Sequence, residues 1–486
     1  MLISAESHPK DHNFKEKVIQ FGTGVLLRGL CDYLIDKANK KGMFRGSIVV
    51  VKSMGSNVSD FSDQDNQYTC CVRGILNGDT VNDNTIVSSI SRVLTAQNDW
   101  EAILETAKSP EMQVVISNTT EVGLQYHAED PNSTAAPESY PGKLTAWLKA
   151  RYEAGLGGVV IIPTELIVDN GRVLKDLVMR QIQEQKLDQS FANWVENENE
   201  FCSSLVDRIV PGKPDGEELE QLYKEIGYED NLLIKAEAYK LWAIEGGEKV
   251  RDILTFADAD KGVVIDKNIT QYRELKLRML NAPHTLMCAL CYLAGFETVK
   301  EALNDELMEK FITILMLTEL APAMPGEIDQ KVVQRYGRDI IDRFRNPYLD
   351  HQWHSITFQY TMKLKMRAVP LLMNYYDVFG TVPHYFSRGF AAYLLFMKAV
   401  KEKDGKYYGE LNGNEYVIND DQAAWYFEKW QSSDAKTLTH EALSNEDFWE
   451  IDLTHLEGFE DSVATHLSNM MSIGVKAVAS ALNVFA

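Results

Sequence analysis

The feature that most constrains this chain is a strand, a glycine turn and a helix in immediate succession near its start. Val18–Phe21 is a short, mostly apolar run, Gly22-Thr23-Gly24 follows, and apolar residues then recur at helical spacing from Leu26 to Ile35. This order predicts a buried strand joined to a helix by a tight turn. Such a turn lets the backbone approach a pyrophosphate, and the helix N-terminus supplies free N–H groups and a favourable dipole.

The glycine pattern matches the dinucleotide fingerprint only in part. Gly22 and Gly24 occupy its first two glycine positions, but Leu27 stands at the third and Gly29 comes two residues late. Two interpretations stay open, a nucleotide-binding turn and a tight turn that only closes a strand. Arg28, in the first helical turn, could neutralise a phosphate or lie solvated on the surface.

The end of the second predicted strand bears on the choice of cofactor. An NAD-selective site usually carries Asp or Glu there, to accept hydrogen bonds from the ribose hydroxyls. Here the strand ends in Val51-Lys52-Ser53-Met54, and the first acid is Asp60. These residues alone leave NAD and NADP open, and Lys52 would tolerate a 2′-phosphate.

Further strand and helix patterns alternate through the first half of the chain. Apolar β-type runs at Ser47–Lys52, Gln113–Ser117 and Gly158–Ile162 are separated by amphipathic stretches such as Trp100–Ala107 and Leu144–Tyr152. Buried strands alternating with helices predict a parallel sheet covered on both faces. Residues 1–270 are therefore predicted to form an α/β, doubly wound domain of the dinucleotide-binding type.

After about residue 270, helical periodicity replaces the strand signals, so residues 271–486 are predicted to form a mainly α-helical substrate and catalytic domain. No long Pro/Gly linker separates the halves, and we expect a ligand cleft at their joint. The expected helices cover Thr285–Leu293, Leu307–Leu320, Ile328–Phe344, Trp353–Leu372, Phe390–Lys401 and Val463–Leu482.

The amino-acid composition limits where in the cell the protein is expected to reside and which molecules it is expected to bind. The six cysteines show no paired framework, no secretory pattern opens the chain and no apolar run is long enough to span a membrane, so we expect a cytoplasmic protein. The net charge of −22 should repel nucleic acid and anionic membranes. We therefore expect a small-molecule substrate, and an anionic one would need a local basic pocket.

A lysine, an asparagine and a histidine follow one another as Lys276-x4-Asn281-x2-His284. On an unbroken helix Asn281 and His284 would lie about 140° and 80° round from Lys276, so all three could face one cleft. Pro283 interrupts the helical ladder, and Asn281 is alternatively expected to end one helix and cap the next. Oxidising a secondary alcohol needs a base, which a desolvated lysine can provide, and donors for the developing alkoxide.

At these residues the chain resembles the long-chain polyol and sugar-acid dehydrogenases. VDRI followed one residue later by Pro, together with K-x4-N-x2-H, is a specific combination, and the resemblance spans nearly the whole chain. The segments that carry it are Phe21–Gly24 with Arg28, Thr120-Glu121, Val206–Pro211, the Lys276/Asn281/His284 set and Asp342–Asn346.

The resemblance implies a Rossmann-type first domain, a helical second domain, NAD(H) as cofactor and no metal. It also implies that Lys276 is the general acid/base and that Asn281 and His284 bind the reacting oxygen. The cofactor-binding residues it implies are Phe21, Gly22, Thr23, Gly24, Arg28, Lys52, Asn118 and Thr119.

The chain departs from the mannitol-type members of this family where substrate is bound. Those members carry Cys-Asp-Asn after the fifth strand, where this chain has Pro163-Thr164-Glu165, and their substrate arginine aligns with about Ser355. These changes favour a carboxylated sugar over mannitol. The expected substrate-binding residues are Glu165, Arg345, His354 and Lys363. Positive charge is expected to concentrate on the segments that line the cleft, at Arg273, Lys276, Arg278, Arg343, Arg345, Lys363, Lys365 and Arg367.

Other patterns favour structure over chemistry. Cys288-x2-Cys291 lacks a second pair and lies in an apolar helix, so core packing is preferred to zinc. His351 and His354 could hold a metal, but substrate contact or helix surface is preferred. Two alternative functions remain: the same chemistry on another sugar acid or an uncharged polyol, and a non-catalytic nucleotide-binding sensor.

Overall fold

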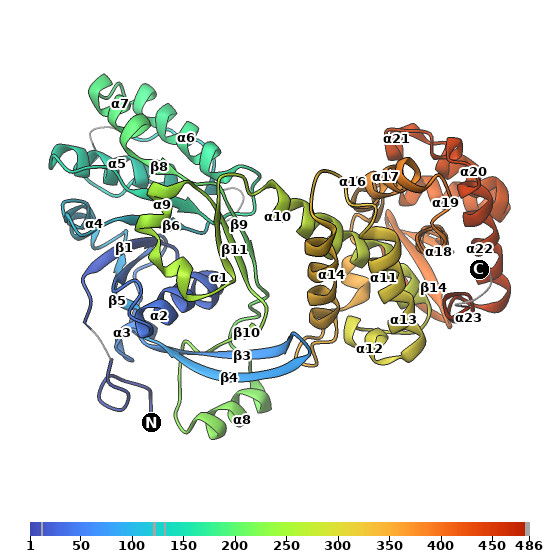
Figure 1. Ribbon diagram of the computed structural model, residues 1–486, viewed down its shortest axis with the longest axis horizontal. Coiled ribbons are helices and arrows are strands. Elements are labelled where there is room, and N and C mark those ends of the chain that lie inside the picture. Colours follow the sequence, from blue (N-terminus) through green and yellow to red (C-terminus); the bar gives the residue numbers. More distant parts are fainter. Residues whose placement is uncertain (11–12, 120–122, 131–132, 482–486) are drawn as a thin grey trace. The chain divides into compact units, whose positions relative to one another are not determined.

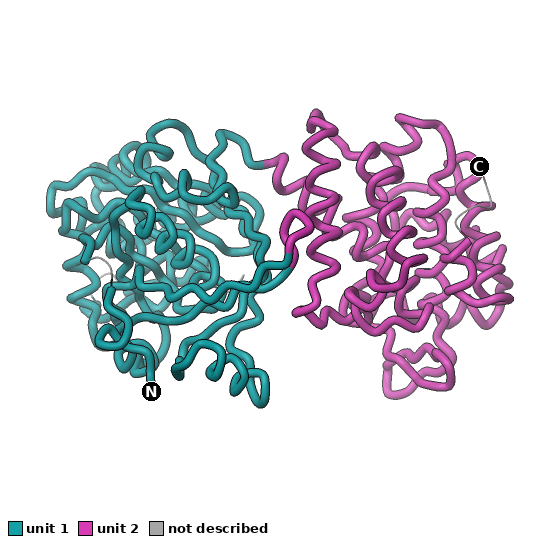
Figure 2. The backbone as a smooth tube through the Cα atoms, turned by 60° about the horizontal axis from the view of Figure 1, so that its bottom comes forward, with its two compact units in different colours: residues 1–74, 80–269 teal, residues 75–79, 270–486 magenta. Residues whose placement is uncertain are grey.

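The computed structural model describes residues 1–10, 13–119, 123–130 and 133–481. The chain divides into two compact units (Figure 2). Unit 1 comprises residues 1–74 and 80–269, and unit 2 comprises residues 270–486 together with residues 75–79. Among the described residues no helix combines the length and apolar character needed to cross a membrane.

Unit 1 is built on a six-stranded parallel sheet in the order β5-β2-β1-β6-β7-β8, visible on the left of Figure 1. The predicted doubly wound α/β architecture is confirmed. The strands are β1 (Glu16–Phe21), β2 (Ser47–Lys52), β5 (Ile90–Thr95), β6 (Val114–Ser117), β7 (Val160–Pro163) and β8 (Glu200–Phe201).

Helices cover both faces of this sheet because alternate side chains point in opposite directions. Ile19 and Phe21 pack in a core with the helices on one face, whereas the intervening Gln20 hydrogen-bonds Asp32 at the other. The first face carries α4 (Trp100–Ala107), α5 (Tyr140–Glu153), α6 (Asn170–Glu184) and α7 (Gln189–Glu198). The helix after the glycine turn runs through α1 (Val25–Leu27), η1 (Arg28–Asp32) and α2 (Tyr33–Lys40).

Two smaller sheets in unit 1 were not predicted. One joins the hairpin β3 (Tyr68–Leu76) and β4 (Asp79–Val87) to β10 (Ile234–Glu237). The other joins β9 (Ser204–Asp207), β11 (Leu241–Glu245) and β12 (Val263–Asp266). The remaining helices of the unit are α3 (Ser59–Ser62), α8 (Gly216–Ile226), α9 (Glu248–Ile253) and η3 (Thr255–Ala259).

Unit 2 is mainly helical, as predicted, and α11 lies at its centre, packed against α15, α16 and α18. Its first helices are α10 (Thr270–Leu275), η4 (Lys276–Asn281), α11 (Ala282–Leu293), α12 (Val299–Asn304), α13 (Glu306–Ile314), η5 (Leu315–Leu320) and α14 (Gln330–Phe344). They are followed by α15 (Trp353–Ile356), α16 (Tyr360–Arg367), α17 (Val369–Phe379), α18 (His384–Phe396), α19 (Ala423–Ser432), α20 (Ala435–Leu443), α21 (Glu446–Trp449), η6 (Leu453–His455), α22 (Phe459–Ile473) and α23 (Val475–Ser480).

Three predicted helices of unit 2 are wrong in extent. The helix expected over Val463–Leu482 is two, α22 and α23, because Gly474 adopts a positive φ of 88° between them. The single helix expected over Trp353–Leu372 is three, because Gln359 adopts a left-handed φ of 51° between α15 and α16 and Pro370 lies in the first turn of α17. The helix expected to reach Lys401 ends at Phe396, and a three-stranded antiparallel sheet follows. Its strands are β13 (Lys401–Lys403), β14 (Lys406–Leu411) and β15 (Asn414–Ile418).

Candidate active site

The glycine turn of unit 1 contains one position where only glycine fits the backbone and its surroundings. Gly22 has a φ of +132°, and a Cβ there would lie 2.9 Å from Leu27 Cδ1 and 3.0 Å from Asn118 O. Gly24 is different, since its φ is −63° and a Cβ would meet no atom within 4 Å. Gly22 is therefore needed by the protein's own packing, whereas the space beside Gly24 is open at the start of α1.

A cavity of about 690 Å³ opens at this turn, within the size range of small-molecule and cofactor sites. Six of the predicted cofactor-binding residues line it: Phe21, Gly22, Thr23, Lys52, Asn118 and Thr119. The cavity is also lined by residues that follow β6 or belong to the start of α5, among them Gln125, Tyr126, His127, Ser139, Tyr140 and Lys143. Sequence reasoning missed these residues, for which the only available signal was their position after the carboxyl end of β6.

The Arg28 side chain is buried beside the turn, where it contacts other parts of the protein. These contacts do not indicate a role in phosphate binding. The Arg28 Nη1 donates to Leu232 O, the Nε donates to Thr23 O at 3.4 Å, and the guanidinium lies 5.4 Å from the Tyr68 ring centroid. Neither Arg28 nor Gly24 is among the residues that line the cavity. In this conformation the Arg28 head group therefore holds the turn in place.

Glu165 holds the end of β6 and the residues that follow it, beside the cavity, whereas the sequence predicted that Glu165 binds substrate. Its carboxylate accepts hydrogen bonds from the Thr119 backbone N–H at 2.9 Å and from the Ser117 hydroxyl at 3.2 Å. Asn118 is held by the adjacent Thr164, whose carbonyl and hydroxyl oxygens both lie 3.0 Å from Asn118 Nδ2. Burial raises the pKa of Glu165 above its ordinary value. Thr120 and Glu121, which contribute to the family resemblance, lie outside the described residues.

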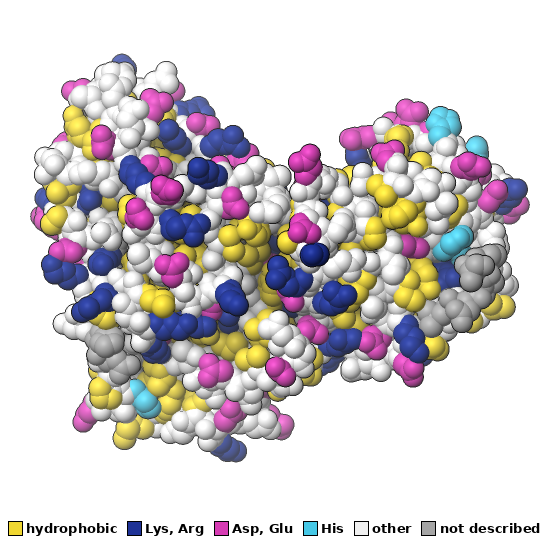
Figure 3. Space-filling model, viewed as in Figure 1, with side chains coloured by type: hydrophobic (Ala, Val, Ile, Leu, Met, Phe, Trp, Pro, Cys, Tyr) yellow, Lys and Arg dark blue, Asp and Glu magenta, His cyan; other side chains and the backbone are white. Residues whose placement is uncertain are grey.

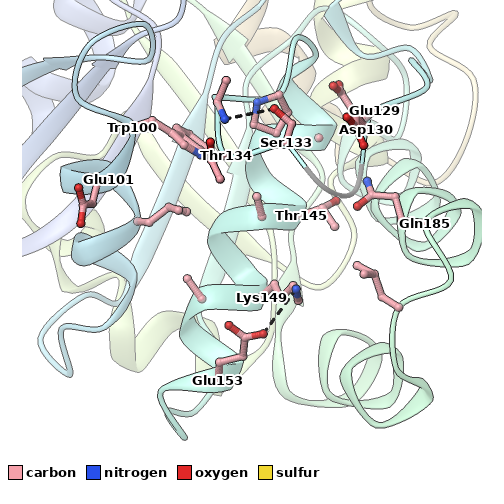
Figure 4. A pocket seen from close by; sticks show the side chains of 17 residues that line it. Trp100, Glu101, Glu129, Asp130, Ser133, Thr134, Thr145, Lys149, Glu153 and Gln185 are labelled. Carbon is pink, nitrogen blue, oxygen red and sulfur yellow. Dashed lines mark hydrogen bonds and ion pairs between the residues drawn. The ribbon is translucent and has the colours of Figure 1, made fainter.

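A second cavity of unit 1, about 430 Å³ in volume, lies between α4, α5 and the segment around Glu129 (Figure 4). It contains none of the predicted site residues. Its labelled lining is rich in acids, and the Lys149 ammonium is already 3.5 Å from a Glu153 oxygen on the same helix. Its chemistry therefore does not suit an anionic substrate.

In unit 2 the predicted lysine and asparagine begin and end a π-helical turn. The helix continues from α10 through η4 into α11, and the Ala282 N–H donates to Leu277 O, five residues back. A turn that closes at the fifth residue brings Lys276 and Asn281 to about the same side of the helix. The alternative in which Asn281 caps a new helix is wrong, since its backbone is helical and its side chain makes no capping hydrogen bond. Pro283 is accommodated in the first turn of α11.

His284 lies three residues beyond Asn281, on the adjacent face of the helix. Its ring centroid is 4.2 Å from that of Phe344, 5.1 Å from that of His351 and 6.0 Å from that of Trp353. Burial, followed by the charges of nearby His351, Arg343 and Arg367, holds the pKa of His284 well below its ordinary value, so the ring is neutral. Nε2 is buried and has no hydrogen-bond partner in the described part of the chain, so the hydrogen bond to Leu280 O belongs to Nδ1–H.

Cations gather around this segment in an otherwise acidic chain. On the face shown in Figure 3, Lys and Arg side chains collect over α14, whose exposed cations are Lys331, Arg335 and Arg338. Arg343 of the same helix is buried. Several predicted cleft cations are neutralised: Arg278 pairs with Glu274, Lys365 with Glu450, and Arg345 with Glu309 and Asp342. Lys363 and Arg367 form no such ion pair with any described residue.

The histidine beside His284 is His351, whereas the predicted substrate residue His354 lies elsewhere in unit 2. His354 Nε2 lies 3.0 Å from Val417 O, and its ring packs against Tyr292, Phe396 and Tyr416. Arg345, the other predicted substrate residue of this region, is held by two carboxylates. In this structure both therefore have structural partners. The Lys363 ammonium donates to Ile356 O at 3.1 Å and to no other acceptor among the residues described.

The six cysteines are buried free thiols, including Cys288 and Cys291 inside α11. Within the described part of the chain no group of three or more His, Cys, Asp or Glu side chains is arranged to hold a metal ion. Core packing is the role that this environment gives to the Cys288-x2-Cys291 pair.

Comparison with known proteins gives consistent matches. The family model for the mannitol dehydrogenase Rossmann domain matches residues 16–254, and that for the mannitol dehydrogenase C-terminal domain matches residues 268–471. A Halalkalibacterium halodurans protein named altronate oxidoreductase is 37% identical, with 98% of this chain and 94% of that protein covered. The Bacillus subtilis protein of the same name is 34% identical, with 96% and 95% covered.

Two solved structures share the fold. A substrate-free D-sorbitol dehydrogenase superposes with a TM-score of 0.78 at 20% identity, covering 98% of this chain and 97% of that one. The mannitol 2-dehydrogenase of Pseudomonas fluorescens, solved with NAD and D-mannitol, gives a TM-score of 0.64 at 21% identity, with 99% of each chain covered. At this level of identity the likeness concerns architecture alone.

Proposed function

The chain belongs to the mannitol dehydrogenase family, and on that basis we propose that it interconverts D-tagaturonate and D-altronate with NAD(H), using Lys276 as the general acid/base. The observation that carries this proposal is the near-full-length similarity, at 34–37% identity, to altronate oxidoreductases. The Lys276/Asn281/His284 set and the cations of unit 2 support it independently of the relatives' names.

The residues of unit 1 fit a dinucleotide. The open space beside Gly24, the free N–H groups at the start of α1 and the cavity lined by Phe21, Asn118 and Thr119 suit a pyrophosphate and the groups attached to it. The cofactor, when bound, supplies a hydride to the keto carbon or accepts one from the carbinol carbon. Lys52 and Ser53 replace the usual acid at the end of β2, so NADPH is a necessary control.

Lys276 is the residue that exchanges a proton with the substrate oxygen. In the reductive direction its ammonium gives a proton to the keto oxygen, and in the oxidative direction its neutral amine removes the hydroxyl proton. The π-turn brings Asn281 to the same side, where its amide can donate to the oxygen that carries developing negative charge. His284 donates through Nδ1 to Leu280 O, which leaves Nε2 as the acceptor atom of a neutral ring. The role proposed for Nε2 is therefore to accept a hydrogen bond from a sugar hydroxyl, whereas the sequence predicted a donor to the reacting oxygen.

The location proposed for this reaction is the cytoplasm. Six buried free thiols suit a reducing compartment, and the absence of a spanning helix among the described residues does not conflict with it.

A substrate panel tests the proposal. The purified chain should oxidise NADH with D-tagaturonate at a kcat/KM at least about tenfold above that with D-fructuronate or D-fructose, the margin of one well-made contact. A preference for D-fructuronate would replace the substrate and keep the chemistry. NADH binding without turnover of any of the three, in a single-turnover assay, would indicate a nucleotide-binding sensor and contradict the proposal.

A further inference from the structure

Two cations on α16 stand one helical turn apart, and neither forms an ion pair with a residue that the structure describes. Lys363 and Arg367 are four residues apart and partly buried, a spacing at which like charges destabilise a helix. Burial lowers the pKa of both groups, and the charge of Arg367 lowers that of Lys363 further. Two positive groups this close repel each other, which destabilises the folded protein. No carboxylate among the described residues pairs with either group to offset that repulsion.

Hydrogen bonds hold Arg367 beside the predicted catalytic turn. Its Nη1 donates to Thr285 Oγ1 at 3.1 Å, and that hydroxyl in turn donates to Asn281 O at 2.8 Å. The Arg367 carbonyl accepts a hydrogen bond from Arg278 Nη1 at 2.9 Å. Arg367 is also close enough to His284 to lower the pKa of that ring. The guanidinium is therefore fixed against the stretch that carries Asn281 and His284.

The hydrogen bonds of Arg367 leave much of its head group for a ligand. A guanidinium has five N–H donors in a planar fork, and only one hydrogen bond from this fork, to Thr285, is formed within the described structure. A carboxylate can accept two parallel hydrogen bonds from such a fork. A second positive charge one turn away, on Lys363, would strengthen the attraction for an anion.

We propose that Arg367 binds the carboxylate of the sugar acid and so selects a carboxylated substrate over an uncharged sugar, with Lys363 adding a second positive charge. This inference rests on the proposed function, because it assigns one end of that substrate. In a hexuronate the carboxylate and the keto group lie towards opposite ends of the chain. Arg367 is accordingly a specificity-determining residue rather than a participant in proton transfer.

The test uses a matched pair of substrates and a matched control variant. D-altronate and D-altritol differ in that a CH2OH group replaces the carboxylate, so their ratio of kcat/KM isolates its recognition. In Arg367→Gln the value for D-altronate should fall about 100-fold, mostly through KM, while that for D-altritol stays within about twofold of wild type. Arg367→Lys should restore part of the loss. Lys365→Gln, on the same helix but paired with Glu450, should behave as wild type.

A binding measurement supplements the kinetics. D-altronate should raise the Tm of the wild-type protein and of Lys365→Gln, but not that of Arg367→Gln at the same concentration. An unchanged altronate-to-altritol ratio in a folded Arg367→Gln protein would overturn the inference. Equal losses with both substrates would also overturn it, since they would indicate a general positioning role.

Failure of the proposed function is recognised separately, in the wild-type protein. If that protein prefers D-fructuronate to D-tagaturonate, the proposed substrate is wrong, and D-mannonate with D-mannitol then tests Arg367 in the same way. Loss of the preference for the acid in Arg367→Gln would support the inference in that case, and its retention would refute it. A wild-type protein that uses only uncharged sugars would refute both.

Discussion

The two units carry candidate sites of different construction. In unit 1 the site is made largely by backbone: a glycine with a φ of +132°, a helix N-terminus and a loop held by Glu165. In unit 2 the candidate site consists of side chains: Lys276 and Asn281 at the two ends of one π-turn, His284 on α11, and Arg367 of α16, which donates to Thr285. The first kind depends on conformations that few residues can adopt, and the second depends on the chemistry of particular groups.

That difference leads to different expectations for mutation. Substitutions in the turn of unit 1 should change folding or cofactor affinity, with the chemistry intact once the cofactor is saturating. Substitutions in unit 2 should change the rate or the substrate preference, with cofactor binding intact. The variants described below test whether the effects of substitutions in the two units differ in this way.

The largest effect is expected from Lys276→Ala. Removing the proton donor should lower kcat about 1000-fold with D-tagaturonate, since positioned acid/base groups contribute on that order. NADH affinity, measured by fluorescence titration, should stay within about twofold of wild type because the binding turn is in unit 1. Lys365→Ala serves as the control on a paired lysine of the same unit. A Lys276→Ala protein that retains wild-type kcat would refute the assignment.

The two glycines of the turn should behave differently from each other. Gly24→Ala fits the protein's own packing, so its Tm should match wild type while its Kd for NADH rises about tenfold or more, because a methyl group occupies the approach to the pyrophosphate. Gly22→Ala should lower Tm as well, because its φ is positive and the new Cβ meets Leu27 and Asn118. Equal Tm values for both variants would contradict the distinction.

His284 should not titrate in the working pH range. Its pKa lies well below the ordinary value, so it remains neutral, and His284→Gln, which retains an acceptor, should lower kcat/KM about tenfold without moving the inflections of its pH profile. The measurement is kcat/KM from about pH 5.5 to about pH 8.5 for both proteins. Disappearance of an inflection in the variant would mean that His284 exchanges protons during turnover.

The smallest effect on activity is expected at Glu319, which supports unit 2 from η5. Its carboxyl group accepts N–H hydrogen bonds from Tyr385 at 2.9 Å and Phe386 at 2.8 Å, and burial raises its pKa to about 7. Between the unfolded pKa near 4.5 and about 7 the native state holds a proton that the unfolded state has lost. The group therefore contributes stability at low pH that is lost as pH rises towards 7.

Glu319→Gln should remove this dependence, because the amide stays neutral and keeps an acceptor for the α18 N–H groups. Thermal unfolding at about pH 5 and about pH 8 should show a smaller loss of Tm in the variant, corresponding to about 2–3 kcal/mol. The kcat of the variant should equal that of wild type. A wild-type Tm that rises between the two pH values relative to the variant would have the wrong sign for this account.

The main sheet was predictable because its strands are short, apolar and bounded by turns, as in Ser47–Lys52, which is β2 residue for residue. The sheet β13–β15 was missed although its signals are present. Asp404-Gly405 and Asn412-Gly413 join the strands, and all four residues have positive φ as type I′ hairpin turns require. The exposed, charged character of the strands masked the alternation that would have identified them.

The residues of the candidate sites could be proposed from the sequence, but the way in which these residues are arranged in space could not. K-x4-N-x2-H identified the three residues of η4 and α11, but nothing in their order shows that a π-turn aligns the first two. Arg345 and Lys365 pair with acids, whereas Arg367 forms no ion pair with a described residue, and this difference depends on contacts between residues distant in sequence. Arg28 and Glu165 likewise acquire their positions from the Leu232 and Thr119 backbones, which pattern alone does not reveal.

The central claim is hydride transfer to a hexuronate, and isotopic labelling tests it most directly. The wild-type protein is incubated with D-tagaturonate and NADH deuterated on the transferred face of C4, and the product is analysed by NMR. We expect D-altronate with one deuterium on the new carbinol carbon and none elsewhere. A product without deuterium at that carbon, or a sugar acid other than D-altronate, would contradict the proposed function.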